Sequence, residues 1–476
     1  MAESGEPQEI KKYQTYALNV DSNQDDKATE IKLCNFSRPH MRAFHCSWWA
    51  FFIAFFIWFS IAPLLSEIKD DLGLSKQQIW TSNIVSVMGT IFMRFALGPA
   101  CDKYGARVLF TVILCGCSIP AALTGIAQDA KDLIILRLFI GLVGSCFVMC
   151  QYWSSRMFTK EVVGTANALV GGWGNLGGGV TQLVMGSALF PLFKMGMSST
   201  MAWRTVCIVP AAVGFVTGVA VYFISDDAPK GNYSEMKKNG TMPQVSAAAS
   251  FRSGAMNINT WILFIQYGCS FGVELTMNNA AAMYFGEIFD LSTESSAAIA
   301  SIFGWMNLFA RGLGGYMSDK LNAKMGMRGR LITQFLLLAV EGVLIFVFSR
   351  SKSLPGSIVT MVFFSIMVQG AEGSTYGIVP YVNPASTGSI AGIVGAGGNT
   401  GAVCFGLAFR QLPSYLQAFD IMGGIVLASS LLSGVIFIKG HTHMFGGQET
   451  ISQKMAGAGE IEIPMADAEG AAEVNA

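Results

Sequence analysis

The chain has 476 residues, equal numbers of basic and acidic side chains, 52% apolar residues and only 13% charged residues. This charged share is about half that of an ordinary soluble domain, which excludes a pair of water-soluble domains, and the zero net charge gives no reason to expect a nucleic-acid partner. The ten cysteines lie almost entirely within apolar runs. This placement is typical of packing residues and not of a disulfide framework, so we expect no metal site and no cofactor.

Twelve apolar runs predict twelve membrane-spanning helices. Each run has about 20 residues or more, the length that an α-helix needs to cross the hydrocarbon core of a bilayer. In chain order the runs cover 44–65, 78–98, 108–127, 132–153, 163–190, 205–224, 259–285, 295–316, 330–349, 355–380, 388–411 and 417–438. The sequence therefore predicts an all-α, polytopic protein embedded in a lipid bilayer.

One long polar connection divides these spans into two sets of six, and it contains Pro229 and Pro243. Lysine and arginine are about twice as frequent in the connections on the side of the termini as in the others, so the positive-inside rule predicts that both termini are cytoplasmic. The expected segments are a cytoplasmic tail over 1–43, a six-helix half over 44–224, a cytoplasmic central loop over 225–258, a second six-helix half over 259–438 and a cytoplasmic tail over 439–476.

The second span of each half ends in the same motif. An arginine stands eight residues before an Asp-Lys pair, Arg94 before Asp102 and Arg311 before Asp319, with an offset of 217 positions between the two copies. Both arginines lie about two turns inside the bilayer, where a permanent charge costs at least about 2.5 kcal/mol on insertion scales. We therefore interpret both as substrate-binding residues, although a snorkelling arginine or one paired with a buried acid is the alternative.

The fifth span of each half carries a second repeat. GGWGNLGGG surrounds Asn175 and GAGGNTGA surrounds Asn399, with an offset of 224 positions. Two matches at nearly one offset indicate that the second half is a copy of the first in the same membrane orientation, and such repeats place a substrate site near the midplane between the halves. Most of these glycines are explained by close helix packing. A buried amide needs hydrogen-bond partners, so the two asparagines are candidate donors toward the site.

The two arginines predict the chemistry of the substrate. No acidic residue lies one turn from Arg94 or Arg311 in its own span. Two facing guanidinium groups without a nearby carboxylate would form a positive cavity that recruits a small anion, and their planar fork suits planar oxyanions. Nitrate fits this description better than a strongly hydrated phosphate. Nitrite, bicarbonate and a small carboxylate stay open on geometry alone.

Acidic and aromatic residues within the spans are further candidates. Glu274 and Glu372 lie in apolar runs, where an acid either couples transport to protons or holds a hydrogen bond between helices. Phe147, Tyr267 and Phe271 lie mid-span. Tyr267 and Phe271 are four residues apart and share one helix face, so they either line the cavity or pack against lipid and neighbouring helices.

Charged residues after the second span of each half form the predicted cytoplasmic gate. Asp102 and Arg107 belong to GPACDKYGAR, and Asp319 belongs to GGYMSDK. We expect the two aspartates to pair with basic residues or helix ends on the cytoplasmic face. A merely solvated turn is the alternative.

Taken together, these motifs resemble the nitrate/nitrite porter family of the major facilitator superfamily over essentially all of residues 40–440. The segments that carry the resemblance are the two arginine motifs, the two glycine-asparagine stretches, RLFIGLVGSCFVMCQYW in the fourth span and GAEGSTYGIVPYV in the tenth. The sequence is more similar to the eukaryotic high-affinity nitrate transporters of plants and algae, with their short central loop, than to the fungal members.

The resemblance implies that nitrate, or alternatively nitrite, is held between Arg94 and Arg311. It also implies that the counterparts of Asn175, Tyr267, Phe147 and Phe271 line the site, and it extends with less force to Asn399. Eukaryotic members import nitrate together with protons by rocking their two halves, mainly at the plasma membrane. Some bacterial relatives exchange nitrate for nitrite. The resemblance further implies a small single-span accessory protein as a partner. The carboxyl-terminal tail of this chain is shorter than that of many plant members, which use such a partner.

Three other functional classes fit the sequence less well. A carrier of another small anion shares every motif above. A nitrate sensor would signal through its tails, which are short and contain no recognisable domain. An enzyme would need a nucleophile–base pair, a metal-ligand spacing or a phosphate loop, and the sequence contains none of these patterns.

Overall fold

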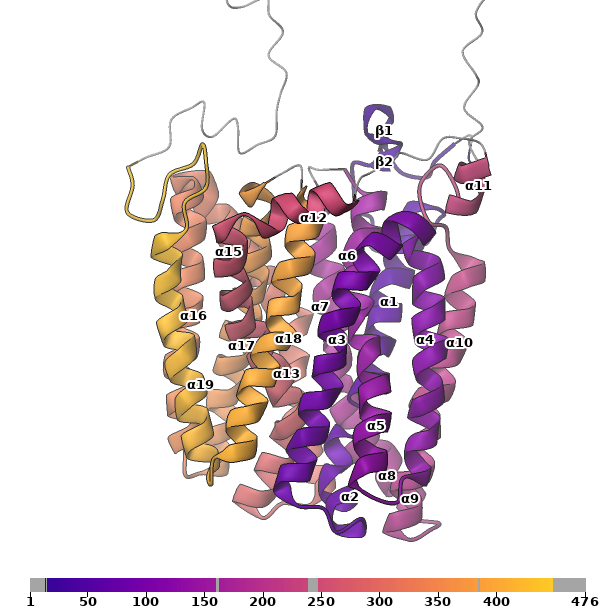
Figure 1. Cartoon of the computed structure of the whole chain (residues 1–476), viewed down its shortest axis with the longest axis vertical. Helices are drawn as coiled ribbons and strands as arrows, with labels where there is room; N and C mark the ends of the chain where they lie inside the picture. Colours follow the sequence, from indigo (N-terminus) through magenta and orange to yellow (C-terminus); the bar gives the residue numbers. More distant parts are fainter. Residues whose placement is uncertain (1–12, 14, 160–161, 239–246, 384–385, 448–476) are drawn as a thin grey trace, which may run out of the picture.

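The computed structural model describes residues 13, 15–159, 162–238, 247–383 and 386–447 (Figure 1). The outer parts of the two predicted tails therefore lie outside the described residues. The described chain forms an upright bundle of helices that cross it twelve times, and each predicted span falls on one crossing. Most helices begin or end a few residues beyond the predicted boundaries, because helical hydrogen bonding continues past the apolar segment into polar caps.

The first six crossings contain several helices that are broken within the span. In chain order they are α1 (His40–Trp58) with η2 (Ala62–Leu64) and α2 (Leu65–Asp71), α3 (Lys76–Tyr104), α4 (Ala106–Leu123) with η3 (Thr124–Ile126), α5 (Ala130–Gly141) with η4 (Leu142–Ser145) and α6 (Cys146–Met157), α7 (Val163–Thr181) with η5 (Gln182–Leu189) and α8 (Phe190–Lys194), and α9 (Ser199–Val206) with α10 (Ile208–Ile224).

The last six crossings are longer and mostly continuous. They are α13 (Ile258–Phe289), α14 (Thr293–Trp305) with η6 (Met306–Leu308) and α15 (Ala310–Met325), α16 (Met327–Arg350), α17 (Leu354–Val382), α18 (Thr387–Gln411), and α19 (Tyr415–Ser430) with η8 (Leu431–Val435). The central connection carries two short helices, α11 (Tyr233–Lys238) and α12 (Ala247–Ala255), and the amino-terminal segment carries η1 (Ser22–Gln24) and the antiparallel strands β1 (Val20–Asp21) and β2 (Lys27–Ala28).

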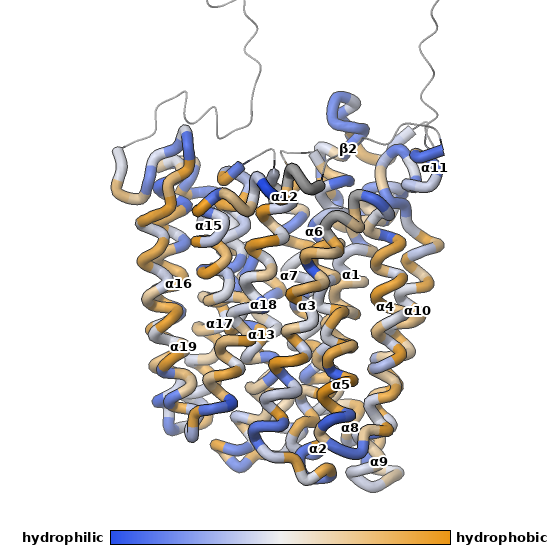
Figure 2. The backbone as a smooth tube through the Cα atoms, in the orientation of Figure 1, coloured by the Kyte–Doolittle hydropathy of each residue, from blue (hydrophilic) through white to orange (hydrophobic). Residues whose placement is uncertain are grey.

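Both described ends of the chain lie on one face of the bundle, which we call the terminal face (Figure 1). Arg38 donates to the carbonyl oxygens of Phe223 and Ile224 at the end of α10. Near the other end, Asn259 exchanges two hydrogen bonds with the backbone of Phe437. The connections after α2, α8, α13, α16 and α18 lie on the opposite face. Figure 2 shows hydrophilic residues gathered at both faces and hydrophobic ones along the helices between them.

Nine helices of the described chain are long and apolar enough to cross a membrane by composition alone. The three remaining crossings are α3, α13 and α14 with α15. These three carry Arg94, Glu274 and Arg311, which are candidate site residues. The protein is therefore a multi-pass membrane protein, and charged site residues lie on crossings that are not among those nine.

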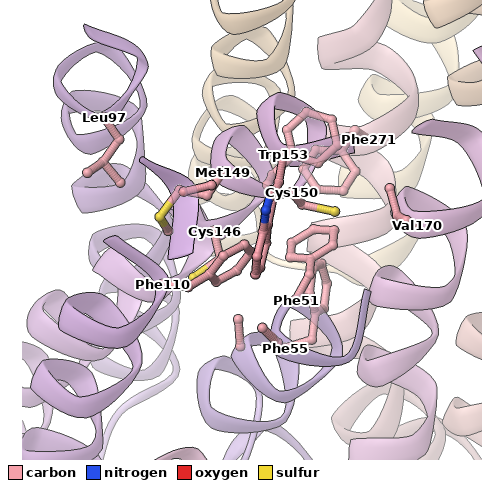
Figure 3. Packing of buried hydrophobic residues seen from close by; sticks show 14 of the residues in the cluster. Phe51, Phe55, Leu97, Phe110, Cys146, Met149, Cys150, Trp153, Val170 and Phe271 are labelled. Carbon is pink, nitrogen blue, oxygen red and sulfur yellow. The ribbon is translucent and has the colours of Figure 1, made fainter. Parts of the chain in front are cut away.

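The cysteines behave as packing residues, as the sequence predicts. Seven of the ten are buried and none forms a disulfide. Figure 3 shows Cys146 and Cys150 of α6 between the rings of Phe51, Phe110 and Trp153. A polarizable thiol fills such irregular gaps between aromatic rings without a hydrogen-bond requirement.

Glycines allow the closest helix contacts in the second half. A Cβ atom on Gly401 of α18 would overlap the carbonyl group of Gly268 on α13. The backbones of the two helices touch at this point, and any side chain would force them apart. Gly392 lies on the same helix but has nothing within 4 Å of the position of its missing Cβ.

These two glycines predict opposite results for the same substitution. Gly401→Ala should lower the melting temperature of the purified protein, because the α13–α18 contact cannot form. Gly392→Ala should leave it unchanged or raise it, because alanine is favoured over glycine in a helix by about 0.5–1 kcal/mol. Thermal unfolding in detergent measures both, and an equal melting temperature for the two variants would contradict the close contact.

Candidate functional site

The site residues stand where helices are interrupted. α3 begins with a capping box between Ser75 and Gln78 and carries Arg94 on its later turns. Its neighbouring crossing changes from α5 to the 3₁₀ turn η4 and then to α6, and this change leaves the carbonyl of Gly144 beside Arg94. In the second half, the break at η6 separates α14 from α15 directly before Arg311. Interrupted helices free backbone groups for a ligand at mid-membrane depth.

Arg94 is fully buried and touches no carboxylate of the described chain. Its guanidinium donates to the carbonyl oxygens of Gly395 and Gly144. The guanidinium carbon lies 5.0 Å from the ring centre of Phe147 and 5.5 Å from that of Phe271. Its Nε–H has no hydrogen-bond partner. Arg94 therefore keeps an uncompensated positive charge and a free donor inside the bundle, as the sequence predicts.

Arg311 differs from the prediction. Its Nη1 forms a 2.5 Å ion pair with Oε2 of Glu372, and its Nη2 donates to the hydroxyl of Tyr267 at 2.9 Å. The expectation of two arginines without a nearby carboxylate is therefore wrong for this arginine. The acid was not visible along its own span, because Glu372 comes from α17, which packs beside α15. The alternative of an arginine paired with a buried acid holds here.

A second acid, Glu274 of α13, lies beside Glu372, and the Oε2 of Glu274 and the Oε1 of Glu372 have no hydrogen-bond partner in the described chain. Both side chains are fully buried. The amide of Asn307, in the break before α15, donates to Glu274 at 3.0 Å. One proton shared between the two carboxyl groups would allow a hydrogen bond between these oxygens. The two acids predicted as proton-coupling candidates therefore lie together, and Glu372 contacts Arg311 directly.

The charge of this cluster depends on that proton. Arg94 and Arg311 contribute two positive charges, and Glu274 and Glu372 contribute two negative charges when both are ionised. With the shared proton in place the cluster has a net charge of +1. A small anion is then favoured in this buried environment, where opposite charges attract strongly.

Aromatic rings surround the guanidinium groups. The guanidinium carbons of Arg94 and Arg311 lie 5.0 and 5.9 Å from the centre of the Phe147 ring, so they are separated by no more than about 11 Å, the sum of the two distances. Phe271 is stacked on Tyr267, with ring centres 5.3 Å apart, and faces Phe147 at 6.4 Å. The structure therefore brings the three predicted aromatic residues together around the two arginines.

Sequence reasoning missed a fourth ring, that of Tyr376. It contacts Tyr267 and Phe147 edge-on, with ring centres 5.1 and 5.7 Å apart. Its hydroxyl donates to the carbonyl of Ala391 on α18. Tyr376 follows Glu372 by four residues on α17, so the helical spacing from a candidate acid was the signal that would have found it.

The two repeated asparagines are buried without hydrogen-bond partners. Neither the oxygen nor the nitrogen of the Asn175 or Asn399 amide is bonded within the described chain, although both residues are completely buried. Such groups are costly unless a ligand or water satisfies them. Four residues before each asparagine stands a glycine, and this glycine lies beside an arginine of the opposite half. Gly171 lies beside Arg311, and Gly395 lies beside Arg94. Both amides thus stand one helical turn from a guanidinium.

The predicted gate residues lie on the terminal face. Arg107 pairs with Asp227 at 3.3 Å and donates to the carbonyl of Tyr222. Burial raises the pKa of Asp227 above its usual value, and the nearby Arg107 opposes this rise. Asp319 pairs with Arg330 at 2.7 Å. Both contacts join neighbouring helices of one half, so in this conformation they stabilise each half and do not bridge the two. The side chain of Asp102 lies outside the described part of the structure.

Comparison with known proteins identifies the family. The family model of the Major Facilitator Superfamily matches residues 47–407. The chain belongs to this superfamily. High affinity nitrate transporter 2.5 of Arabidopsis thaliana is 37% identical over 434 residues, covering 91% of this chain and 86% of that protein. High-affinity nitrate transporter 2.3 of rice is 39% identical, covering 87% and 81%. Within the superfamily, this member is therefore related to the eukaryotic high-affinity nitrate transporters, as its motifs indicate.

More distant matches support the fold. A nitrate/nitrite transporter of the cyanobacterium Nostoc punctiforme is 27% identical and covers 86% of this chain and 94% of that protein. The crystal structure of a bacterial homolog of the human lysosomal transporter Spinster superposes with a TM-score of 0.61 at 14% identity, covering 84% of this chain and 96% of that chain. The nucleoside transporter NupG superposes with a TM-score of 0.58 at 15% identity, covering 83% and 100%. The protein is a secondary transporter and not an enzyme.

The unpartnered amides give a test that separates binding from stability. Asn175→Ala and Asn399→Ala should raise the KM for the transported anion severalfold, because each removes a ligand donor. Their melting temperatures should stay near that of the wild type, because neither amide has a bond to lose.

Asn259→Ala is the matched control. Its amide makes two hydrogen bonds to Phe437, so this variant should be destabilised by about 1 kcal/mol per bond while its KM is unchanged. Uptake into proteoliposomes and thermal unfolding measure the two quantities. A large loss of stability in the Asn175 or Asn399 variant would argue for a structural amide.

Proposed function

We propose that this transporter carries nitrate, with nitrite as a second substrate, by alternating access of its two six-helix halves. The main support is the arrangement of Arg94 and Arg311, one from each repeat, around the ring of Phe147. Their nearby amides are unpartnered, and the similar plant proteins are named as nitrate transporters. A flat, weakly hydrated anion matches guanidinium forks and aromatic faces better than a tetrahedral, strongly hydrated one.

The proposed binding step uses each group in a defined way. The free Nε–H of Arg94 and the fork of Arg311 donate to the oxygens of the anion. The amides of Asn175 and Asn399 replace water molecules that the anion loses on binding. The four aromatic rings described above exclude further water. Because each arginine lies beside a glycine of the opposite half, the anion draws the halves together around itself. This contact favours an occluded, loaded state.

We further propose that Glu274 and Glu372 carry the coupled proton. Glu372 contacts Arg311 directly, Glu274 lies beside Glu372, and a proton on the pair makes the cluster positive. Loss of the proton lets Glu372 compete with the anion for Arg311 and thereby promotes release. This competition supports proton symport over nitrate/nitrite exchange, in which no carboxylate would need to contact the binding arginine.

The proposed cellular arrangement follows from charge and family. The terminal face would lie in the cytoplasm, since lysine and arginine gather in its connections, and the protein would import nitrate across the plasma membrane. A small single-span accessory protein is a proposed partner. Glycosylation mapping of the two faces tests the orientation.

Conservative substitution of the arginines tests the substrate site. Arg94→Lys and Arg311→Lys keep the charge but lose the planar fork, so the kcat/KM for nitrate should fall about ten- to hundredfold, equivalent to roughly 1.5–3 kcal/mol. Arg350→Lys is the control, because Arg350 pairs with Asp420 on the surface and should transport normally. Labelled nitrate uptake by purified protein measures this, and wild-type rates in both site variants would remove these arginines from the site.

The carboxyl pair predicts a pH dependence with a defined sign. Protonation raises the cluster charge from zero to +1, so the KM for nitrate in the wild type should fall as the pH is lowered. Glu372→Gln is permanently uncharged and should lose this dependence, whereas Glu287→Gln, at the opposite face beside Lys69, should keep it. Voltage clamp on the wild type should record an inward current when nitrate is added. An outward current would contradict symport of more than one proton per anion.

A further inference from the structure

A third buried arginine, Arg137 of α5, lies outside the site described above. Its side chain is 1% exposed. Its Nη1 donates to the hydroxyl of Ser82 at 3.1 Å and to the amide oxygen of Asn83, both on α3. Its Nη2 donates to the amide oxygen of Asn279 on α13 at 2.9 Å. The guanidinium therefore bridges the two halves of the transporter.

All of these partners are neutral. No carboxylate in the described parts of the chain pairs with Arg137, in contrast to Arg311 with Glu372. Asn83 accepts through its oxygen, so its amide nitrogen points away from the guanidinium, and this nitrogen is buried without an acceptor. The cluster thus combines a permanent positive charge with an unpartnered N–H donor. Such a composition attracts an anion and offers nothing to a cation.

The cluster lies on the same two helices as the central site. On α3, Asn83 precedes Arg94 by eleven residues, which places it about 16 Å closer to the opposite face at 1.5 Å per residue. On α13, Asn279 follows Phe271 by eight residues in the same direction. The seam between the halves therefore carries Arg94 and Arg311 at its centre and Arg137 between that centre and the opposite face.

The seam is closed at that face in this conformation. Lys69 pairs with Glu287, Lys76 donates to the carbonyl of Leu412, and Arg410 donates to the hydroxyl of Thr81. Each of these contacts joins the first half to the second. Opening the opposite face must separate α3 and α5 from α13 and thereby break the contact between Arg137 and Asn279. The guanidinium would then face the open passage with no carboxylate to replace the lost oxygen.

We propose that Arg137 is a second anion station, which receives the anion from the opposite face and passes it to Arg94 and Arg311. The inference rests on the proposed function and deepens it. This station has one guanidinium, whereas the central site has two. It therefore binds a monovalent, weakly hydrated oxyanion more weakly than the central site does and releases it toward that site. When the face closes, Asn279 takes the position of the anion on Nη2.

The test compares uptake from the two faces of the membrane. Labelled nitrate is supplied to intact cells and to everted vesicles that express the same variant. Arg137→Gln should raise the KM about tenfold in the preparation that presents the opposite face to nitrate and leave it unchanged in the other. Arg204→Gln is the matched control, because this arginine lies on the same face but pairs with Asp71, and its KM should not change in either direction.

Two further variants separate an anion station from a purely structural bridge. Asn279→Ala removes the bridge but keeps the charge, so it should not raise the KM. If Arg137→Gln fails to reach the membrane, Arg137→Lys replaces it. Its KM should rise severalfold only when nitrate is presented at the opposite face.

The inference is overturned by an unchanged KM in the Arg137 variant, by an equal rise in both directions, or by an equal rise in the Asn279 variant. A wild type that carries no nitrate would overturn the proposed function and this inference together. Normal nitrate uptake by the wild type, together with an unchanged KM in the Arg137 variant, would overturn the inference alone.

Discussion

The ion pair between Arg311 and Glu372 is the interaction on which the rest of the site depends. A guanidinium keeps its charge at any physiological pH, and burial of that charge is costly unless other groups compensate it. Glu372 supplies that compensation for Arg311. In the proposed mechanism the site alternates between two states, one with a carboxylate on Arg311 and one with a proton on the pair. A site built from two isolated arginines would attract an anion but would have no comparable means to release it.

The repeat extends this local chemistry to the whole molecule. Each glycine-asparagine stretch approaches the arginine of the other half, Gly171 beside Arg311 and Gly395 beside Arg94. An anion that binds both arginines therefore contacts both halves, and its binding energy acts on the angle between them. Close backbone contacts such as that of Gly268 with Gly401 keep each half rigid, so the movement is concentrated at the seam. Arg137 and the polar contacts at the opposite face lie along that same seam.

Helices that carry buried charged groups supply the chemistry of the candidate site. α3, α13 and α15 hold Arg94, Glu274 and Arg311 on buried faces, and α17 holds Glu372. A transporter needs such helices, since a wholly apolar bundle has no group that can replace the hydration of an ion.

The sequence by itself determined the twelve crossings and the repeat, because hydrophobic length and matched motifs are local properties of the chain. It also indicated Arg94, Arg311 and the paired asparagines, since a charge or amide inside an apolar run is conspicuous without knowledge of its neighbours. Only the tertiary structure decided which groups meet. Glu372 is 61 positions from Arg311, Arg137 is 142 positions from Asn279, and Tyr376 drew no attention as one aromatic residue among many. Contacts between helices depend on how each helix is rotated about its axis, and this rotation is fixed by packing against all of its neighbours together.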